Sequence, residues 1–221
     1  IPDAAQLTDA AANALLKTLE EPPAQTWFFL ASTEPARLLA TLRSRCRLHH
    51  LAPPPESYAI SWLAREVTAS SEALLSALRL SAGSPGAALT LLQAESWAHR
   101  TDFCAALVNT LNTGDWYILL AALNHDQAAA RLHWLATLLT DALKRPYGVS
   151  HLTNPDALDL ISSIAERLSV AQIQAILGDV CHCRQQLLNV TGVNRELVLT
   201  DLILRIEHYL QPGTVLPVPH L

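Results

Sequence analysis

The sequence contains no methionine, only 7 glycines in 221 residues, and few charged side chains, which make up 16% of the chain. The missing methionine, with a start at Ile1-Pro2-Asp3, leads us to expect that the chain begins inside a longer protein. The low glycine content excludes a glycine-rich repeat polymer. The low charged fraction excludes a disordered chain, and half of the residues are hydrophobic, which is enough for a real core.

Long hydrophobic runs and an excess of positive charge are also absent. No stretch of about 18 apolar residues occurs, so no transmembrane helix is expected. Residues 1–20 lack the basic start and apolar block of a signal peptide. The net charge of −5 and the isoelectric point near 6.0 exclude a generally basic surface for nucleic acid, although a local one remains possible. The length allows one large domain or two to three small ones.

Motifs for independent chemistry are missing. The sequence has no GxxxxGK[ST] phosphate loop, no HExxH and no GxSxG, so the chain alone is not expected to hydrolyse ATP. Cysteines occur at 46, 104, 181 and 183 only, and Cys181-His182-Cys183 is too tightly spaced for a usual zinc site. Reduced thiols without a metal are the expected state.

The first 51 residues alternate between helix-like and strand-like patterns. Thr8 or Asp9 can cap a helix that Pro22-Pro23 must end. The bulky run QTWFFLA is too short for a helix and is typical of a buried strand. The succession predicts an α/β layer with a parallel sheet, with helix, strand, helix and strand at 8–21, 25–31, 36–43 and 46–51.

From the stiff linker Ala52-Pro53-Pro54-Pro55 onward, the pattern changes to all-α, so we place a domain boundary there. No convincing strand follows. Three short helices are expected first, then a larger helical block, and finally an extended tail at 212–221. The predicted helices are 56–68, 70–82, 85–94, 96–111, 115–123, 126–145, 155–167, 169–189 and 194–210.

The last predicted helix carries apolar residues on two sides. One arc of its surface is continuously apolar, from Val198 to Leu210. Leu197 and Leu204 lie one heptad apart on the other side, among charged residues. Two exposed leucines are common on any surface. Alternatively, they contact a partner, and the sequence leaves both interpretations open.

The stretch TLRSRCRLHHL at 41–51 places three arginines two residues apart, at 43, 45 and 47. Its flanks are apolar, so it is not a solvated charge run. Either it is a basic edge of a sheet, or one arginine points at something outside the chain.

Three segments carry a family resemblance. NALLKTLEEPP at 13–23, FLASTEP at 29–35 and LRSRC at 42–46 resemble, in order and spacing, the bacterial replication clamp loaders of the AAA+ class. The resemblance implies the C-terminal part of an AAA+ domain at 1–52, a three-helix lid at 53–94 and an all-helical collar at 95–211. It also implies that about the first third of the protein, with any phosphate loop or zinc module there, lies outside this sequence.

Departures from the family pattern indicate a particular kind of subunit. Pro2-Asp3 stands where ATP-hydrolysing members carry the Asp-Glu pair of Walker B, so the Mg²⁺-binding aspartate is missing. The lid segment from Gly83 to Leu89 lacks the nucleotide-sensing arginine, although Ser32 and Thr33 remain sensor-like. The resemblance then implies a non-hydrolysing stator, which is no enzyme on its own but a component of the DNA polymerase III holoenzyme.

The same resemblance assigns Arg45, with Ser44 and Cys46, as an arginine finger that acts in trans. A planar guanidinium that is always charged can stabilise the charge that develops on the γ-phosphate oxygens. Ser44 is expected to end a helix and Cys46 to begin a strand, which holds Arg45 at a rigid corner.

The cofactors and partners are implied in the same way. No cofactor is expected in this chain, because ATP and Mg²⁺ are bound by neighbouring subunits. The implied partners are gamma/tau and delta subunits in a hetero-pentamer. The sliding clamp and primer-template DNA would be contacted through that complex. The implied location is the bacterial cytoplasm at the replication fork, and no membrane partner is expected. The alternatives are an ATP-hydrolysing gamma-type subunit and a purely helical interaction module.

Overall fold

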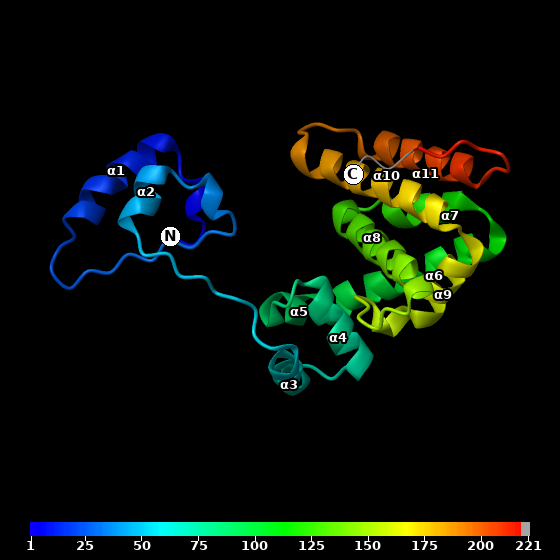
Figure 1. Ribbon diagram of the computed structural model, residues 1–221, viewed down its shortest axis with the longest axis horizontal. Helices are drawn as coiled ribbons and strands as arrows, with labels where there is room; N and C mark the ends of the chain where they lie inside the picture. The colour runs from blue at the N-terminus through cyan, green and yellow to red at the C-terminus, as the bar shows by residue number, and fades with distance from the viewer. Residues whose placement is uncertain (218–221) are drawn as a thin grey trace. The chain divides into compact units, whose positions relative to one another are not determined.

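The computed structural model describes residues 1–217 and divides into two compact units, 1–52 and 53–221 (Figure 1). The division falls after Ala52, within the predicted proline-rich linker. Each unit is described on its own below.

The first unit is built on two helices, α1 (Asp9–Glu20) and α2 (Ala40–Arg45), which pack side by side (Figure 1). The predicted cap of α1 is confirmed, because the Thr8 side chain accepts a hydrogen bond of 3.2 Å from the Ala11 backbone N–H. Two short 3₁₀ turns, η1 (Ala4–Gln6) and η2 (Pro35–Arg37), precede the two helices. Ala12 of α1 and Leu42 of α2 are buried between these elements.

The two strands predicted in this unit are wrong, because residues 25–31 and 46–51 form no regular strand. A strand requires backbone partners on a neighbouring strand. Only the end of the first segment finds such partners: Ile1 and Ala4 bond to the backbone of Phe29 and Ala31 at 2.8–2.9 Å. Trp27, for example, is 83% exposed instead of buried. Within the described residues the unit is helical, and its predicted α/β class is not confirmed.

Three helices open the second unit, as predicted: α3 (Glu56–Glu66), α4 (Ser71–Leu80) and α5 (Pro85–Leu92). They enclose a small core of their own around Ala59, Leu63 and Ala77. The turn before α5 needs glycine at 83, where φ is +80° and a Cβ would lie 3.0 Å from Pro53 Cβ.

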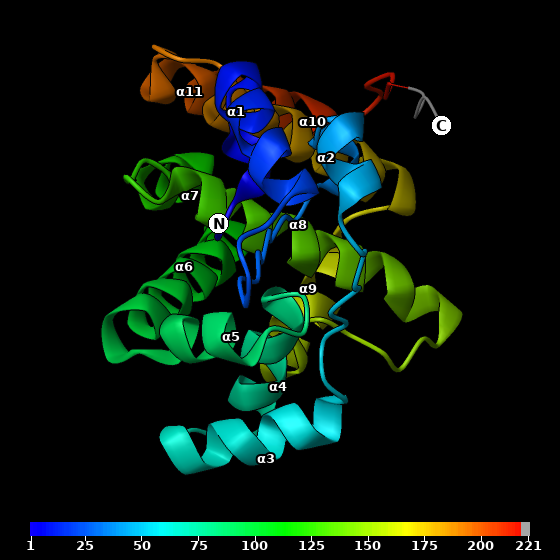
Figure 2. The same ribbon diagram turned by 90° about the vertical axis from the view of Figure 1, so that its left-hand side faces the viewer.

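Six further helices follow and confirm the predicted helical block, with ends shifted by a few residues. α8 packs against α10, and α10 packs against α11. α10 and α11 lie at the end of the unit away from α3–α5 (Figure 2). Their shared core is separate from the core of α3–α5. The helices are α6 (Ala94–Thr113), α7 (Trp116–Leu123), α8 (Ala128–Lys144), α9 (Leu158–Arg167), α10 (Val170–Asn189) and α11 (Arg195–Leu210), with 3₁₀ turns η3 (Arg145–Tyr147) and η4 (Pro155–Ala157).

The predicted extended tail is described only in part. Residues 211–213 form a bend and a turn, residues 214–217 have no regular structure, and residues 218–221 lie outside the described residues.

Membrane-spanning helices were tested over the described residues. No single helix there combines the length and hydropathy that a membrane span needs. The segments Pro155–Arg167 and Val170–Asn189 have the required length and hydropathy only when they are taken together, across a bend of 116°.

Candidate functional site

Arg45 is the last residue of α2. Leu42, only 1% exposed, anchors the helix to the unit, and Cys46 leaves it in an extended conformation. The helix was predicted at 36–43, with Ser44 at its end; α2 instead begins at Ala40 and ends at Arg45, one residue after Ser44, and Cys46 begins no strand. The corner is formed by the helix end itself, because Cys46 has no strand to join.

The Arg45 guanidinium is held by two acceptors. Its Nε donates to Glu20 Oε1 at 2.6 Å, and its Nη2 contacts the same carboxylate oxygen. Its Nη1 donates to the Thr41 carbonyl at 3.0 Å. The Arg45 side chain is 34% exposed and that of Glu20 is 48% exposed, so this ion pair stabilises the fold by at most about 1 kcal/mol.

The other two residues of the predicted motif lie next to Arg45 and have local roles. Ser44 Oγ donates to the Thr41 carbonyl at 3.0 Å, so Ser44 and Arg45 share one acceptor. Cys46 is half-buried, and its sulfur is a free thiol. Both residues help to shape the end of α2.

Arg43 and Arg47 differ from Arg45. Both are exposed, and within the described residues neither side chain forms an ion pair. Arg43 lines a shallow apolar cleft beside Leu38 and Leu48. Only the middle arginine of the three is therefore fixed by other residues of its unit.

The residues predicted at nucleotide-handling positions make local contacts. Pro2 and Asp3 lie at the start of η1, where Asp3 accepts a hydrogen bond of 2.8 Å from Gln6. Ser32 is half-buried, and its hydroxyl accepts from the Glu34 backbone at 3.0 Å, while Thr33 is exposed.

The segment from Gly83 to Leu89 leads into α5. Ser84 caps this helix by accepting a hydrogen bond from the Ala87 N–H, and Pro85 is its first residue. The first turn of α5 carries no basic side chain, as the sequence shows.

Comparisons with known proteins agree along the whole chain. Residues 94–208 match the family model for the C-terminal region of the DNA polymerase III delta subunit, and residues 54–93 match the AAA+ ATPase lid domain of DNA polymerase III subunit delta'. Residues 1–55 match a model described as DNA polymerase III, delta subunit. The chain is 70% identical to subunit delta' of Escherichia coli and 47% identical to that of Yersinia pestis, over 100% of this chain in both cases. The chain belongs to the DNA polymerase III subunit delta' family.

The chain spans about two thirds of these delta' relatives, 66% of the Escherichia coli protein and 67% of the Yersinia pestis protein. It also resembles subunit tau of Salmonella typhimurium, with 62% identity over 39 residues, which is 18% of this chain. The clamp-loader resemblance of residues 13–46 is thus confirmed, at the level of the delta' subunit.

The two leucines singled out on the last helix are exposed in this delta' chain. Leu197 is 67% exposed and Leu204 is 51% exposed, whereas Leu199, Leu202 and Ile206 of the same helix are buried. This arrangement matches the predicted division of α11 into a core side and a second apolar side.

The cysteines at 181 and 183 are separated by the helix that carries them. Cys181 is exposed and Cys183 is buried, so the two thiols do not face one site. Burial, and then the nearby carboxylates of Asp201 and Asp179, raise the pKa of Cys183 to about 11. Within the described residues, no group of three or more metal-ligating side chains comes together.

A buried polar network was missed by the sequence analysis. Arg100 of α6 is 2% exposed and forms an ion pair with Asp156 of η4, while its Nη2 donates to Asn154 Oδ1 at 2.8 Å. Ser76 of α4 donates to the same Asp156. In turn, Asn154 donates to the fully buried Asp141 of α8 at 2.8–2.9 Å. The network links α4 to α6 and α8, and its partners lie too far apart in the sequence to be recognised there.

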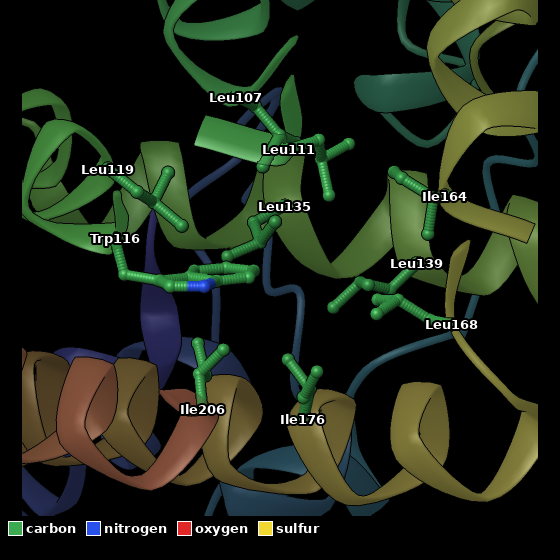
Figure 3. A pocket seen from close by; sticks show the side chains of 10 residues that line it. All are labelled: Leu107, Leu111, Trp116, Leu119, Leu135, Leu139, Ile164, Leu168, Ile176 and Ile206. Carbon is green, nitrogen blue, oxygen red and sulfur yellow. The ribbon is translucent and has the colours of Figure 1, made fainter. Parts of the chain in front are cut away.

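The enclosed apolar cavity in the core of the second unit is too small for a ligand. Figure 3 shows leucine and isoleucine side chains and the Trp116 indole converging on it from several helices. Its volume is about 10 Å³, close to a single water probe, and its lining is apolar. It is a packing void of the core.

Proposed function

We propose that this chain is part of a non-hydrolysing stator subunit of the DNA polymerase III clamp loader. The observation that carries the proposal is Arg45, an arginine fixed at the end of a short helix with part of its side chain still accessible. In a ring of subunits it would reach the ATP site of the neighbour and stabilise the charge that develops on the γ-phosphate.

The nucleotide chemistry would belong to the neighbours. ATP and Mg²⁺ would be bound by gamma/tau subunits, since Pro2 stands at the position of the Walker B aspartate and no arginine opens α5. With delta, these subunits would form a hetero-pentamer in the bacterial cytoplasm. The complex would open the sliding clamp and place it on primer-template DNA.

The collar helices would hold the ring together. Leu197 and Leu204 on α11 are the candidate contacts, because they are exposed while the neighbouring positions on α11 fill the core. The ATP-hydrolysing gamma type is the rival assignment, and an intact phosphate loop in the full-length protein would favour it.

The test is Arg45→Ala in the full-length protein, assembled with its partner subunits. A finger supplied in trans contributes roughly 10³–10⁵ in rate, which is about 4–7 kcal/mol of barrier. DNA-stimulated ATP hydrolysis and clamp loading are expected to fall partially, because one ATP site of the ring faces this subunit, while assembly stays intact.

Arg45→Lys is expected to restore little, because an ammonium cannot make a forked contact. Arg43→Ala and Arg47→Ala are the matched controls from the same stretch. Wild-type loading by Arg45→Ala, or equal impairment by the two controls, would refute the finger.

A further inference from the structure

The contact between Arg45 and Glu20 joins the last residues of two helices. Glu20 ends α1 and Arg45 ends α2, 25 residues further along the chain. Of the arginines at 43, 45 and 47, only Arg45 has a carboxylate partner within the described residues. The arginine proposed to act on a neighbour is thus also the one that its own unit holds in place.

The contact with Glu20 occupies one edge of the Arg45 guanidinium and leaves a second edge without a carboxylate partner among the described residues. Nε and Nη2 form the side edge of this planar group, and both approach the same oxygen, Glu20 Oε1. Nη1 gives one hydrogen to the Thr41 carbonyl. A guanidinium has five N–H donors in a fixed fork. The remaining hydrogens on Nη1 and Nη2 are therefore available for a phosphate oxygen from another chain.

The position of Glu20 is not explained by helix stability. A carboxylate at the C-terminus of a helix is opposed by the helix dipole, which favours cations there. Glu21 follows directly and adds a second negative charge. Within its own helix, Glu20 is thus in an unfavourable place, and the Arg45 guanidinium is what compensates it. Such local conflicts are expected where function constrains a residue.

We propose that Glu20 is a positioning residue for the finger, a role that rests on the function proposed above. It holds the side edge of the Arg45 guanidinium, so that the end of the fork points outward before the neighbouring ATP site arrives. A long arginine side chain otherwise samples many rotamers and must be ordered during the reaction. Since a misplacement of about 1 Å can cost about 10²-fold in rate, this ordering acts on turnover.

The structure specifies which substitutions keep the contact. One oxygen of Glu20 accepts from both Nε and Nη2, so the amide oxygen of Glu20→Gln can take its place. Glu20→Asp keeps the charge but withdraws the carboxylate by one methylene. A positioning role therefore ranks Gln above Asp, whereas a role that depends on charge alone ranks Asp above Gln. Glu21→Ala is the matched control, because Glu21 is adjacent and has no ion pair within the described residues.

The experiment uses the full-length protein assembled with its partner subunits, with the ATP sites that do not face Arg45 disabled. We measure kcat and KM for DNA-stimulated ATP hydrolysis, and confirm assembly by gel filtration. Glu20→Ala and Glu20→Asp are expected to lower kcat about ten- to a hundredfold with KM for ATP unchanged. Glu20→Gln is expected to retain most of the rate, and Glu21→Ala all of it. Adding Glu20→Ala to Arg45→Ala is expected to cause no further loss.

The outcomes separate this inference from the proposed function. If Arg45→Ala lowers kcat but Glu20→Ala and Glu20→Asp do not, the positioning role is refuted and the finger stands. A rate above wild type for Glu20→Ala would make Glu20 a competitor of the phosphate and also refute the role. If Arg45→Ala itself has wild-type kcat, the proposed function fails. Should Glu20→Ala not assemble, the ranking of Glu20→Gln and Glu20→Asp decides.

Discussion

Removing Asp156 tests the buried network that joins α4 to α6 and α8. Arg100 is 2% exposed, and Asp156 is its only carboxylate partner within the described residues. In Asp156→Ala the guanidinium stays buried with the Asn154 oxygen at 2.8 Å and the Trp97 ring 4.8 Å away, neither of which carries a charge. Leaving a buried charge without its partner costs about 3–5 kcal/mol.

The free energy of unfolding is measured with urea, followed by far-ultraviolet circular dichroism, because residues 53–217 contain most of the helices. With a denaturant slope of about 2 kcal/mol per molar, the transition midpoint is expected to fall by about 1.5–2.5 M. Arg100→Met removes the buried charge and keeps a long apolar stem, so its loss is expected to be smaller.

The decisive variant carries both substitutions. If the cost comes from an unpaired buried charge, Arg100→Met with Asp156→Ala must be more stable than Asp156→Ala alone. A double variant destabilised by the sum of the two single losses would contradict this reasoning. So would a loss below about 1 kcal/mol in Asp156→Ala, because Arg100 would then be less buried in solution than in the structure.

Two further predictions concern the surface of the second unit. Leu197→Asp combined with Leu204→Asp is expected to leave the helical content of the chain unchanged and to weaken assembly with partner subunits on gel filtration; unchanged assembly would make both leucines merely exposed. The Arg79 guanidinium, which donates to Glu56 at 2.7 Å and 3.0 Å, lowers the pKa of Glu56 below its ordinary value of 4.5. The stability that this ion pair contributes to the fold is therefore present above pH 4.5 and is lost as the pH falls through the lowered pKa of Glu56. Glu56→Gln should accordingly be less stable than wild type at neutral pH, by at most about 1 kcal/mol, and as stable as wild type in acid. A difference that persists in acid would assign the effect to packing.

The sequence by itself determined the helical part of the protein. Helices follow from local signals, namely apolar residues at a period of 3.6 and capping side chains next to them. Ser84 and Asn194 cap α5 and α11, and the Ser169–Gln172 capping box starts α10. The break after Ala52 lies in the proline-rich linker for the same reason, since proline restricts the backbone locally. The exposed side of α11 at Leu197 also followed from periodicity alone.

Only the tertiary structure decided the contacts between distant residues. The run around Trp27 has the composition of a strand, but a strand forms only with a partner strand, and composition does not supply one. The motif identified Arg45, whereas its partner Glu20 lies 25 residues away on another helix. Arg100 and Asp156 are 56 residues apart, and neither shows in the sequence that it is buried with the other. The physical reason is common to all three: helices are stabilised within one segment, while strand pairing and ion pairs depend on which segments the fold brings together.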